Sequence, residues 1–363
     1  MYRKDISSLF IQPDDSIQQA ILCIDKNVCG IALVVDKQQH LLGTITDGDV
    51  RRAILAGVDL NSAVAGLLER KKNSIYPQPI IAAASAESES LLKLMHERSI
   101  RQVPLLDDHQ RVVDMVVLTD LLPLEDLPLQ AVIMAGGFGT RLRPLTENIP
   151  KPLLPVGDRP LMELMIEQLR ASGIHNIHVT THYLADKVKD YFGDGESLGV
   201  DLQYVTEDSP LGTAGALGLI TPGDDPLLVL NGDILTRLNF RAMLEFHRSH
   251  KAELTVAVRQ YSFQVPYGVL ECEGAHVLSL QEKPSYNFFV NAGIYLVQPS
   301  ALAFIPPRQQ FHMTDLITVL VSQERTIVSF PIVEYWVDIG QSADYEQALK
   351  DVKDGRFFVE LGE

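Results

Sequence analysis

The sequence predicts an α/β protein in two parts, a duplicated N-terminal module and a larger domain built on a mixed, mainly parallel sheet. Within the first 125 residues, one order of helix, strand, turn, strand and helix occurs twice. From Gln130 onward, short apolar runs alternate with amphipathic stretches. This alternation is typical of βαβ units, whose helices cover both faces of the sheet.

The composition is that of a globular protein with a strong acidic balance. The chain has 363 residues, 46% hydrophobic and 21% charged, with a formal net charge of −16. This balance argues against nucleic acid as a partner. No apolar run approaches the roughly 20 residues of a membrane span, and no signal-like segment follows Met1. The three cysteines form no metal-ligand spacing and no even disulfide set. We therefore expect a cytoplasmic protein with no membrane partner.

The first copy of the repeat, residues 1–62, begins with a helix whose apolar residues lie three and four apart, from Ile17 to Ile24. The strands IALVVD and LLGTIT follow, joined by the turn KQQH, and then the helical stretch DGDVRRAILAG. The second copy, residues 63–125, offers ESESLLKLMHERS as a helix, then QVPLLD and VVDMVVLTDLL. Thr46-Asp47 and Thr119-Asp120, 73 residues apart, mark equivalent places. PLEDLPLQ, with Pro123 and Pro128, reads as a linker.

The repeated region resembles a tandem pair of CBS domains, a Bateman module, with GTITDGDVRRAI closest to the final strand and helix of such a domain. In that family a Thr/Ser-x-x-Asp pattern binds the ribose of an adenosine nucleotide. The first copy has Thr46 and Asp49, with Arg51 and Arg52 as phosphate contacts, whereas the second has Leu122 at the aspartate position. The resemblance implies at most one strong site, for an adenine nucleotide or the end product. In the alternative interpretation Asp49 only caps a helix and the pair serves as a dimerisation surface.

The larger domain, predicted over residues 130–352, opens with the strand QAVIMA. A helix is expected over 161–172, begun by Asp158 and Pro160 and ended by Gly173. IHVTT, LLVL, LTVAV and AGIYLV then read as buried strands. Ligands of such sheets bind at the carboxyl ends of the strands, and a glycine-rich loop directly follows the first strand.

The glycine-rich loop matches neither common phosphate-binding fingerprint. In the stretch 137–142, Leu142 stands where a dinucleotide-binding loop has a third small residue, and no Gly-Lys-Ser/Thr follows. A loop remains whose backbone amides can approach phosphate oxygens, with Arg141 and Lys151 as cations.

The stretch AGGFGTRLRPLT…PKPLLPV resembles the signature of the sugar-1-phosphate nucleotidylyltransferases, and the resemblance covers about residues 130–350. It implies a Rossmann-like, GT-A-like fold and the reaction NTP + sugar 1-phosphate → NDP-sugar + diphosphate. Arg141 and Lys151 would then contact the reacting phosphates. The loop positions that would hold the nucleoside triphosphate are Ala135, Gly136, Gly137, Gly139 and Thr140.

Two aspartates are candidate Mg²⁺ ligands. Asp233, in LVLNGDIL, lies among apolar residues, where an uncompensated carboxylate is costly. Mg²⁺ prefers carboxylate and phosphate oxygens. In the family an aspartate at this position binds the metal together with one from a W-x-D-x-G-like stretch, which here supplies Asp338.

The resemblance also implies sugar and base contacts. Glu282 and Lys283 in QEKP would bind the sugar and its phosphate, so that Lys283 joins the catalytic cations, with Gly268, Asn291 and Gly293 around the hexose. In EDSPLGTAGAL, the residues Glu207, Gly212 and Thr213 would lie against the nucleoside.

The form LGTAG resembles the mannose-1-phosphate guanylyltransferase branch and favours GTP. Catalytic domains joined to CBS pairs resemble glucosamine-1-phosphate guanylyltransferases of surface-glycan or nonulosonic acid biosynthesis. No general base is required, because the attacking phosphate is already ionised.

Other readings remain open. One is a uridylyl- or thymidylyltransferase of the same fold, and another is a catalytically inactive, nucleotide-sensing regulatory subunit. Inactive relatives lose metal or phosphate ligands, and this chain keeps Arg141, Lys151, Asp233, Lys283 and Asp338. A further alternative makes the CBS pair a binding module for partner proteins, and we expect a homo-oligomer.

Overall fold

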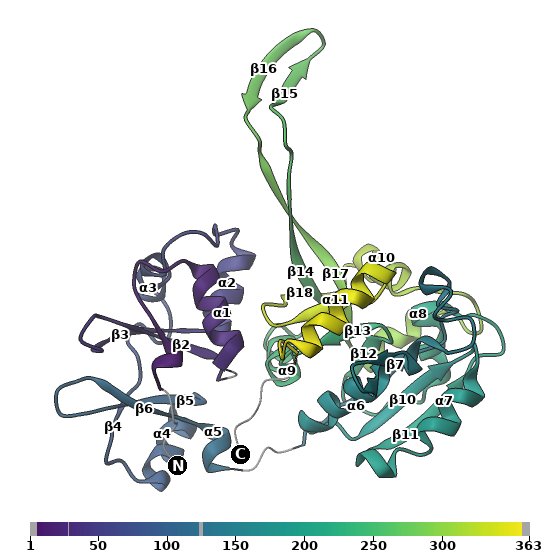
Figure 1. Cartoon of the computed structure of the whole chain (residues 1–363), viewed down its shortest axis with the longest axis horizontal. Coiled ribbons are helices and arrows are strands. Elements are labelled where there is room, and N and C mark those ends of the chain that lie inside the picture. The colour runs from purple at the N-terminus through teal and green to yellow at the C-terminus, as the bar shows by residue number, and fades with distance from the viewer. Residues whose placement is uncertain (1–5, 28, 123–125, 358–363) are drawn as a thin grey trace.

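The computed structural model describes residues 6–27, 29–122 and 126–357. It separates the chain into an N-terminal lobe, a larger C-terminal lobe and a long hairpin arm that projects from the latter (Figure 1). Across these described ranges, no helix combines the length and the apolar character that crossing a bilayer requires.

The N-terminal lobe contains the expected duplication. Each half has a three-stranded sheet in which the first strand is parallel to the second and the second antiparallel to the third. The first half consists of β1 (Phe10–Ile11), α1 (Ile17–Asn27), β2 (Ile31–Val35), β3 (Leu41–Thr46), α2 (Asp47–Leu55) and α3 (Ala65–Lys71). It therefore extends beyond the expected boundary at residue 62, because Leu67 of α3 is buried in the core of this half. The second consists of β4 (Ala82–Ala83), α4 (Ser88–Arg98), β5 (Gln102–Leu106), β6 (Val112–Val117) and α5 (Leu118–Leu121).

Strand pairing corrects the register of the repeat. Ile31 pairs with Thr46 in the first sheet, and Gln102 pairs with Val117 in the second, so equivalent residues are 71 apart. The expected spacing of 73 is therefore wrong. The hydrogen-bonded pairing of the strands defines equivalent positions in the two halves, and the two Thr-Asp dipeptides do not occupy equivalent positions. Asp120 is the counterpart of Asp49, so the second half keeps the aspartate and has Val117 where the first has Thr46.

The two halves share a core between their sheets. Leu33 and Val35 of β2 are buried together with Val112 and Met115 of β6. The other face of the first sheet is covered by α1 and α2, which bury apolar residues at helical spacing. Each half therefore depends on its neighbour for one covered face.

The C-terminal lobe is built on a seven-stranded sheet in the order β11-β10-β7-β12-β17-β14-β18. Of these strands β17 runs antiparallel to both neighbours, so the sheet is mixed and mainly parallel, as predicted. The strands are β7 (Gln130–Met134), β10 (Asn176–Thr181), β11 (Asp201–Thr206), β12 (Leu227–Asn231), β14 (Leu254–Gln264), β17 (Ser285–Val297) and β18 (Ile327–Pro331).

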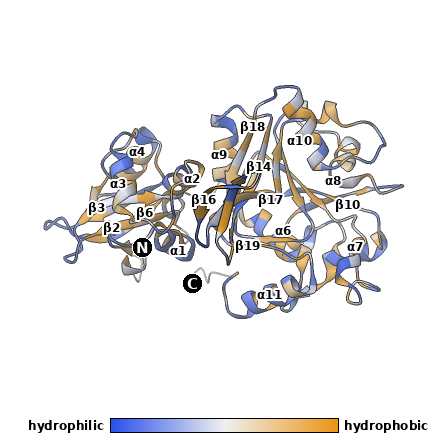
Figure 2. Cartoon of the chain, turned by 90° about the horizontal axis from the view of Figure 1, so that it is seen from above, coloured by the Kyte–Doolittle hydropathy of each residue, from blue (hydrophilic) through white to orange (hydrophobic). Residues whose placement is uncertain are grey.

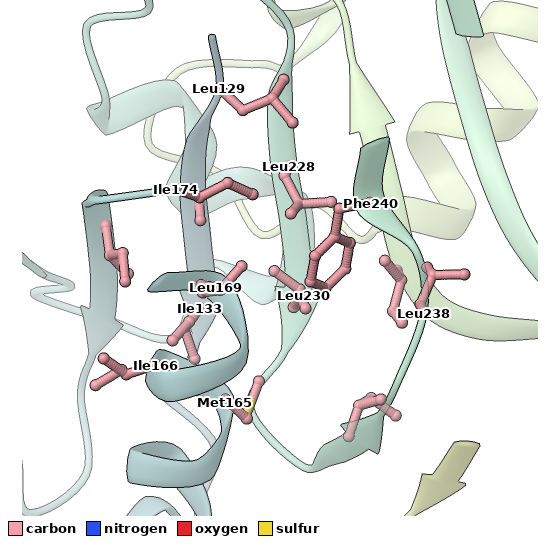
Figure 3. Close-up of a cluster of buried hydrophobic side chains, with 14 of the residues drawn as sticks. Leu129, Ile133, Met165, Ile166, Leu169, Ile174, Leu228, Leu230, Leu238 and Phe240 are labelled. Carbon is pink, nitrogen blue, oxygen red and sulfur yellow. The ribbon is translucent and has the colours of Figure 1, made fainter. Parts of the chain in front are cut away.

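Helices cover both faces of this sheet because alternate strand residues point to opposite sides. Ile133 and Leu230 pack with α6 (Leu161–Ala171), α7 (Ala185–Phe192) and α9 (Phe240–Ser249), as Figure 3 shows for part of this cluster. Val132 and Val229 pack toward α8 (Gly212–Gly215) and α10 (Met313–Ser322). The last helix is α11 (Ser342–Lys353). In Figure 2 the strands of this sheet are coloured mainly as hydrophobic, whereas the helices around them carry both hydrophilic and hydrophobic residues.

The predicted helix over 161–172 is confirmed as α6, which is followed by Gly173 at φ +79°. Pro123 of the predicted linker lies outside the described residues. Its later part packs on the C-terminal lobe, where Leu127 is buried and its N–H donates to the carbonyl of Gly173 at 2.8 Å.

The arm is a continuation of two core strands. Beyond the sheet, β14 and β17 stay paired from Val258–Asn291 out to Gln264–Ser285. They lead into a terminal hairpin of β15 (Val269–Glu273) and β16 (His276–Gln281), seen at the top of Figure 1.

The N-terminal lobe meets the C-terminal lobe through α2, which faces it in Figure 1. The guanidinium of Arg51 lies 2.7 Å from a carboxylate oxygen of Glu334, 4.1 Å from the ring centre of Phe330, and also donates to the carbonyl of Pro331. Burial alone would raise the pKa of Glu334, but the adjacent Arg51 holds it below its ordinary value. Arg51 was expected to contact phosphate, and the structure instead buries it in this interface.

Candidate active site

The candidate site lies where β7 and β12 end side by side, at the carboxyl edge of the parallel strands. Asn231 pairs with Met134, and the N–H of Gly232 donates to the Met134 carbonyl at 3.0 Å. A Cβ atom at position 232 would lie 2.6 Å from that carbonyl oxygen, so the close approach requires glycine. This contact places Asp233 beside the glycine-rich loop that follows β7.

A second short ladder brings the two predicted aspartates together. β13 (Ile234–Thr236) pairs antiparallel with β19 (Trp336–Asp338), so that Ile234 lies opposite Asp338. The N–H of Ile339 donates to the carbonyl of Asp233 at 2.9 Å. The pKa of Asp338 is raised, first by burial and then by the negative charge of Asp233. Two neighbouring carboxylates, one of which disfavours the charge of the other, are a donor set that fits a divalent cation.

Two predicted cations flank these carboxylates. The Lys151 ammonium lies 2.6 Å from Asp233. Arg141 follows the glycine loop, and a Cβ atom at position 340 would lie 3.5 Å from both its Nη1 and an Asp338 carboxylate oxygen. Both cations act to lower the pKa of Asp338. The structure therefore brings four charged residues together, although the first and the last of them, Arg141 and Asp338, are 197 positions apart in the sequence.

The glycine loop itself is open on one side. The buried Ala135 is anchored by its N–H to the Thr180 carbonyl at 3.1 Å, whereas Gly137 and Thr140 are exposed. Gly139 adopts φ +63°, and its carbonyl accepts from the Thr146 hydroxyl at 2.6 Å. The loop thus has a fixed base and an accessible crest, which suits contact with phosphate oxygens.

The residues predicted to lie against the nucleoside border this loop. Glu207 is buried, and its carboxylate accepts from the N–H of Leu211 at 2.8 Å. A Cβ atom at position 136 would lie 2.6 Å from that carboxylate, so Glu207 abuts the loop at Gly136. Thr213 accepts from the N–H of Met313 at 3.0 Å, which ties α8 to the start of α10.

A polar cavity of about 300 Å³ opens beside the carboxylates. Its lining residues are Thr213, Asn231, Ile234, Asn291, Gly293, Tyr295, His312, Met313, Thr314 and Asp338. Four of them were predicted for the base, sugar or metal. The cavity therefore connects the three predicted subsites at one place.

Sequence reasoning missed the other lining residues. Asn231 has a buried side-chain oxygen with no hydrogen-bond partner among the described residues, and its amide lies 2.6 Å from where a Cβ at position 293 would be. Its place two residues before Asp233 was an available signal. His312 and Thr314 lie at the start of α10, where Asp315 accepts from the His312 N–H at 2.8 Å. Nothing in the spacing of that stretch separates them from an ordinary helix start.

Three predicted residues lie elsewhere. Gly268, Glu282 and Lys283 are exposed on the arm, between its ribbon and its terminal hairpin. A Cβ atom at position 268 would lie 3.1 Å from the Glu282 carboxylate, so these residues are neighbours there. The structure thus separates the predicted sugar contacts into Asn291 and Gly293 at the cavity and three residues on the arm.

The residues predicted to bind the CBS ligand make hydrogen bonds and ion pairs with neighbouring residues of the same chain. Thr46 and Asp49 cap α2 reciprocally, with the Thr46 N–H donating to Asp49 at 3.0 Å. The same carboxylate accepts from Lys71 at 2.8 Å and from Arg52 at 2.6 Å. Burial alone would raise the pKa of Asp49, but Lys71 lowers it below its ordinary value.

The fold and this site define an α/β domain with a glycine-rich loop, two cations and two carboxylates at the carboxyl edge of its parallel strands, and comparison with known proteins assigns it to a family. Residues 130–355 match the Nucleotidyl transferase family, and residues 4–56 match the CBS domain. The chain belongs to the Nucleotidyl transferase family and carries a CBS domain at its N-terminus.

Similar proteins differ in the base that their names give. A UTP–glucose-1-phosphate uridylyltransferase of Synechocystis is 34% identical over 245 residues, covering 62% of this chain and 63% of the relative. A probable mannose-1-phosphate guanylyltransferase of Oryza sativa is 34% identical over 232 residues, covering 61% and 64%. The chain thus spans slightly less than two thirds of these relatives.

A crystal structure of a putative glucose-1-phosphate thymidylyltransferase from Bacillus anthracis, in complex with a sucrose, is also similar. It has a TM-score of 0.52 and 26% identity, covering 65% of this chain and 98% of that one.

Proposed function

We propose that the protein is a sugar-1-phosphate nucleotidylyltransferase, which converts NTP and sugar 1-phosphate to NDP-sugar and diphosphate. The observation that carries this proposal is the convergence of the glycine loop, Arg141, Lys151, Asp233 and Asp338 beside one polar cavity. The relatives support it, since the names of all three describe transfer of a nucleotidyl group to a hexose 1-phosphate.

In the reaction, an oxygen of the sugar phosphate attacks the α-phosphorus of the nucleotide. A new P–O bond forms as the bond to the β-phosphate oxygen breaks, and diphosphate leaves with that electron pair. The nucleophile is an ionised phosphate oxygen, so no side chain has to remove a proton. Arg141 and Lys151 neutralise and position the two anions, which is the main contribution a protein makes to phosphoryl-type transfer.

Asp233 and Asp338 would hold Mg²⁺, and their carboxylate pair fits such an ion. When bound, the ion supplies positive charge to the reacting phosphates. Lys151 already pairs with Asp233, so this lysine has a fixed position from which to contact phosphate.

The single experiment that tests the function is incubation of the purified chain with each NTP and a panel of sugar 1-phosphates, with diphosphate release as the measurement. An inactive regulatory subunit would release none with any pair. The retained phosphate and carboxylate residues favour the active enzyme over that alternative.

We expect GTP to be preferred over UTP and dTTP, with a hexose or amino-hexose 1-phosphate as the second substrate. The reason is the LGTAG form of residues 211–215, which packs against the start of α10 at the cavity. The measurement is the ratio of NDP-sugar products when the three nucleotides compete at equal concentration. A dominant UDP- or dTDP-sugar would place the protein in another branch.

We also expect at most one strong adenine-nucleotide site in the CBS pair, at Thr46 and Asp49. Val117 offers no hydroxyl at the equivalent place in the second half, although Asp120 is present. Asp49→Ala should weaken binding of AMP or ATP by roughly 5- to 150-fold, the equivalent of about 1–3 kcal/mol for lost ribose hydrogen bonds.

Equilibrium titration with AMP, ATP and the nucleotide sugar measures this binding. Asp120→Ala is the matched control, because the residue is the counterpart of Asp49 in the other half. Two equal sites per chain, or binding that Asp49→Ala leaves unchanged, would contradict the expectation.

A further inference from the structure

The two candidate metal-binding aspartates lie at one end of the ladder between β13 and β19. Asp233 directly precedes β13, and Asp338 is the last residue of β19. The ladder pairs three residues from each strand, and an isolated two-stranded pairing is marginally stable in water. Its side chains Ile234 and Leu235 pack in two apolar cores of the C-terminal lobe. The other end of the ladder is held by contacts of a different kind, which come from the N-terminal lobe.

The chain that leaves β13 is held by α1 of the N-terminal lobe. Arg237 directly follows β13, and its guanidinium forms an ion pair with the Asp25 carboxylate. The backbone N–H of Arg237 donates to the carbonyl of Tyr335 at 2.9 Å, which joins it to the chain that enters β19. The Nε of Arg237 is buried with no hydrogen-bond partner among the described residues. Burial raises the pKa of Asp25 and the charge of Arg237 acts to lower it, so each charge compensates the other.

The chain that enters β19 is held by the same lobe. Val333 is buried in the apolar core of the first half of the N-terminal lobe, together with Ile24 of α1 and Ala53 of α2. The next residue, Glu334, is paired with Arg51 of α2. Both strands of the ladder therefore adjoin residues that α1 and α2 contact, and these two helices face the C-terminal lobe in Figure 1.

The contacts from the N-terminal lobe stand at equal distances along the chain from the two carboxylates. Arg237 comes four residues after Asp233, and Glu334 comes four residues before Asp338. At about 3.3 Å per residue, each contact lies roughly 13 Å along an extended chain from the carboxylate of its own strand. The hydrogen bonds of the ladder hold the two strands together, so that a displacement at one end is carried to the other. The separation of the two carboxylates therefore depends on residues of the other lobe.

Another ion pair between the lobes lies away from the ladder. Arg101, directly before β5, lies 3.1 Å from Glu245 of α9. These side chains are 40% and 62% exposed, so their attraction is screened by water. This pair joins the same two lobes without contacting either strand of the ladder.

We propose that Asp25 and Arg237 are positioning residues of the candidate active site. Through their ion pair, the N-terminal lobe holds the β13–β19 ladder in the position at which Asp233 and Asp338 can share one divalent cation. The pair acts through the ladder and not by contact with a substrate. This inference rests on the proposed transferase function.

The first test is the dependence of diphosphate release on Mg²⁺. Asp25→Asn removes the charge that pairs with Arg237, and it should raise the Mg²⁺ concentration for half-maximal rate by about 5- to 10-fold, within the usual range of coupling between sites. The KM for the sugar 1-phosphate should change by less than about twofold, because the cavity lined by Asn291 and Gly293 is left intact. Asp25→Glu keeps the charge and should restore most of the affinity for Mg²⁺.

Hydrogen exchange followed by mass spectrometry gives a readout that needs no activity. Peptides covering β13 and β19 should exchange about 5- to 10-fold faster in Asp25→Asn than in the wild type, because the ladder opens more often. Peptides covering α6 and β7 should be unchanged. Arg237→Gln removes the other partner of the pair and should give the same pattern, so the result does not depend on the folding of a single variant.

Glu245→Gln is the matched control, because it removes the ion pair between the lobes that lies away from the ladder. It should leave the Mg²⁺ dependence and the exchange of the ladder as in the wild type. An Asp25→Asn chain that matches the wild type in both measurements would overturn the proposal. Equal effects of Asp25→Asn and Glu245→Gln would also overturn it, since the pair would then only join the lobes. Absence of diphosphate release with every substrate pair would instead overturn the transferase function, and hydrogen exchange would still test whether the pair holds the ladder.

Discussion

Replacement of Arg51 by methionine will destabilise the chain by about 3–5 kcal/mol, because it leaves the Glu334 carboxylate buried without its cation. The remaining donors to this carboxylate are the N–H groups of Val333 and Asn239, at 3.0 and 3.2 Å. They cannot replace a guanidinium at 2.7 Å. The measurement is urea denaturation followed by the fluorescence of Trp336, which is the one tryptophan of the sequence.

Two controls identify the cause of this loss. Arg52→Met removes an arginine whose side chain is 68% exposed, and it should change the free energy of unfolding by less than about 1 kcal/mol. Arg51→Met combined with Glu334→Leu should recover much of the loss, since an apolar pair can replace a buried ion pair. A single Arg51 variant as stable as the wild type would show that the interface does not hold Glu334 in this way.

Asp233→Asn should lower turnover by at least about 100-fold, which corresponds to the several kcal/mol that charge neutralisation of reacting phosphates supplies. The change removes one of the two carboxylates and also the ion pair that positions Lys151. Asp338→Asn should act similarly, because Asp338 lies opposite Ile234 in the same ladder. The measurement is the rate of diphosphate release with the best substrate pair.

The matched control is Asp224→Asn, an exposed carboxylate in the loop before β12, which should retain full activity. Unchanged circular dichroism and melting temperature show that each variant is folded. Release near the wild-type rate by both the Asp233 and Asp338 variants would remove these residues from the site.

Much of the fold could be predicted because local signals agreed with tertiary structure. The apolar spacing of α6, the glycine after it and the short buried runs of β7, β10 and β12 each specify an element without reference to distant residues. The placement of Asp233 beside the glycine-rich loop was also predictable from the sequence, since each follows a strand and the carboxyl ends of parallel strands share an edge.

Other features depend on long-range pairing that no local pattern records. The 71-residue register of the duplication appears only in the ladders. Arg51 looks like any exposed helical arginine until β18 packs against α2. The alternation in RQYSFQ was a signal for a longer β14, but its pairing with β17 appears only in the ladder. For the same reason, motif order alone could not place Glu282 and Lys283 on an arm.

The segment from Pro331 to Asp338 is contacted by three separate parts of the molecule. Arg51 binds its first half, Arg259 at the root of the arm donates to the carbonyls of Ile332 and Glu334 at 3.2 and 3.0 Å, and β13 pairs with its last residues up to Asp338 in the candidate site. Its length is therefore fixed by three partners at once. Addition or loss of a single residue here would shift the phase of a strand, turning Asp338 away from Asp233 or Glu334 away from Arg51. Changes in chain length are accommodated instead at the arm tip, where Gly274 has open space around it.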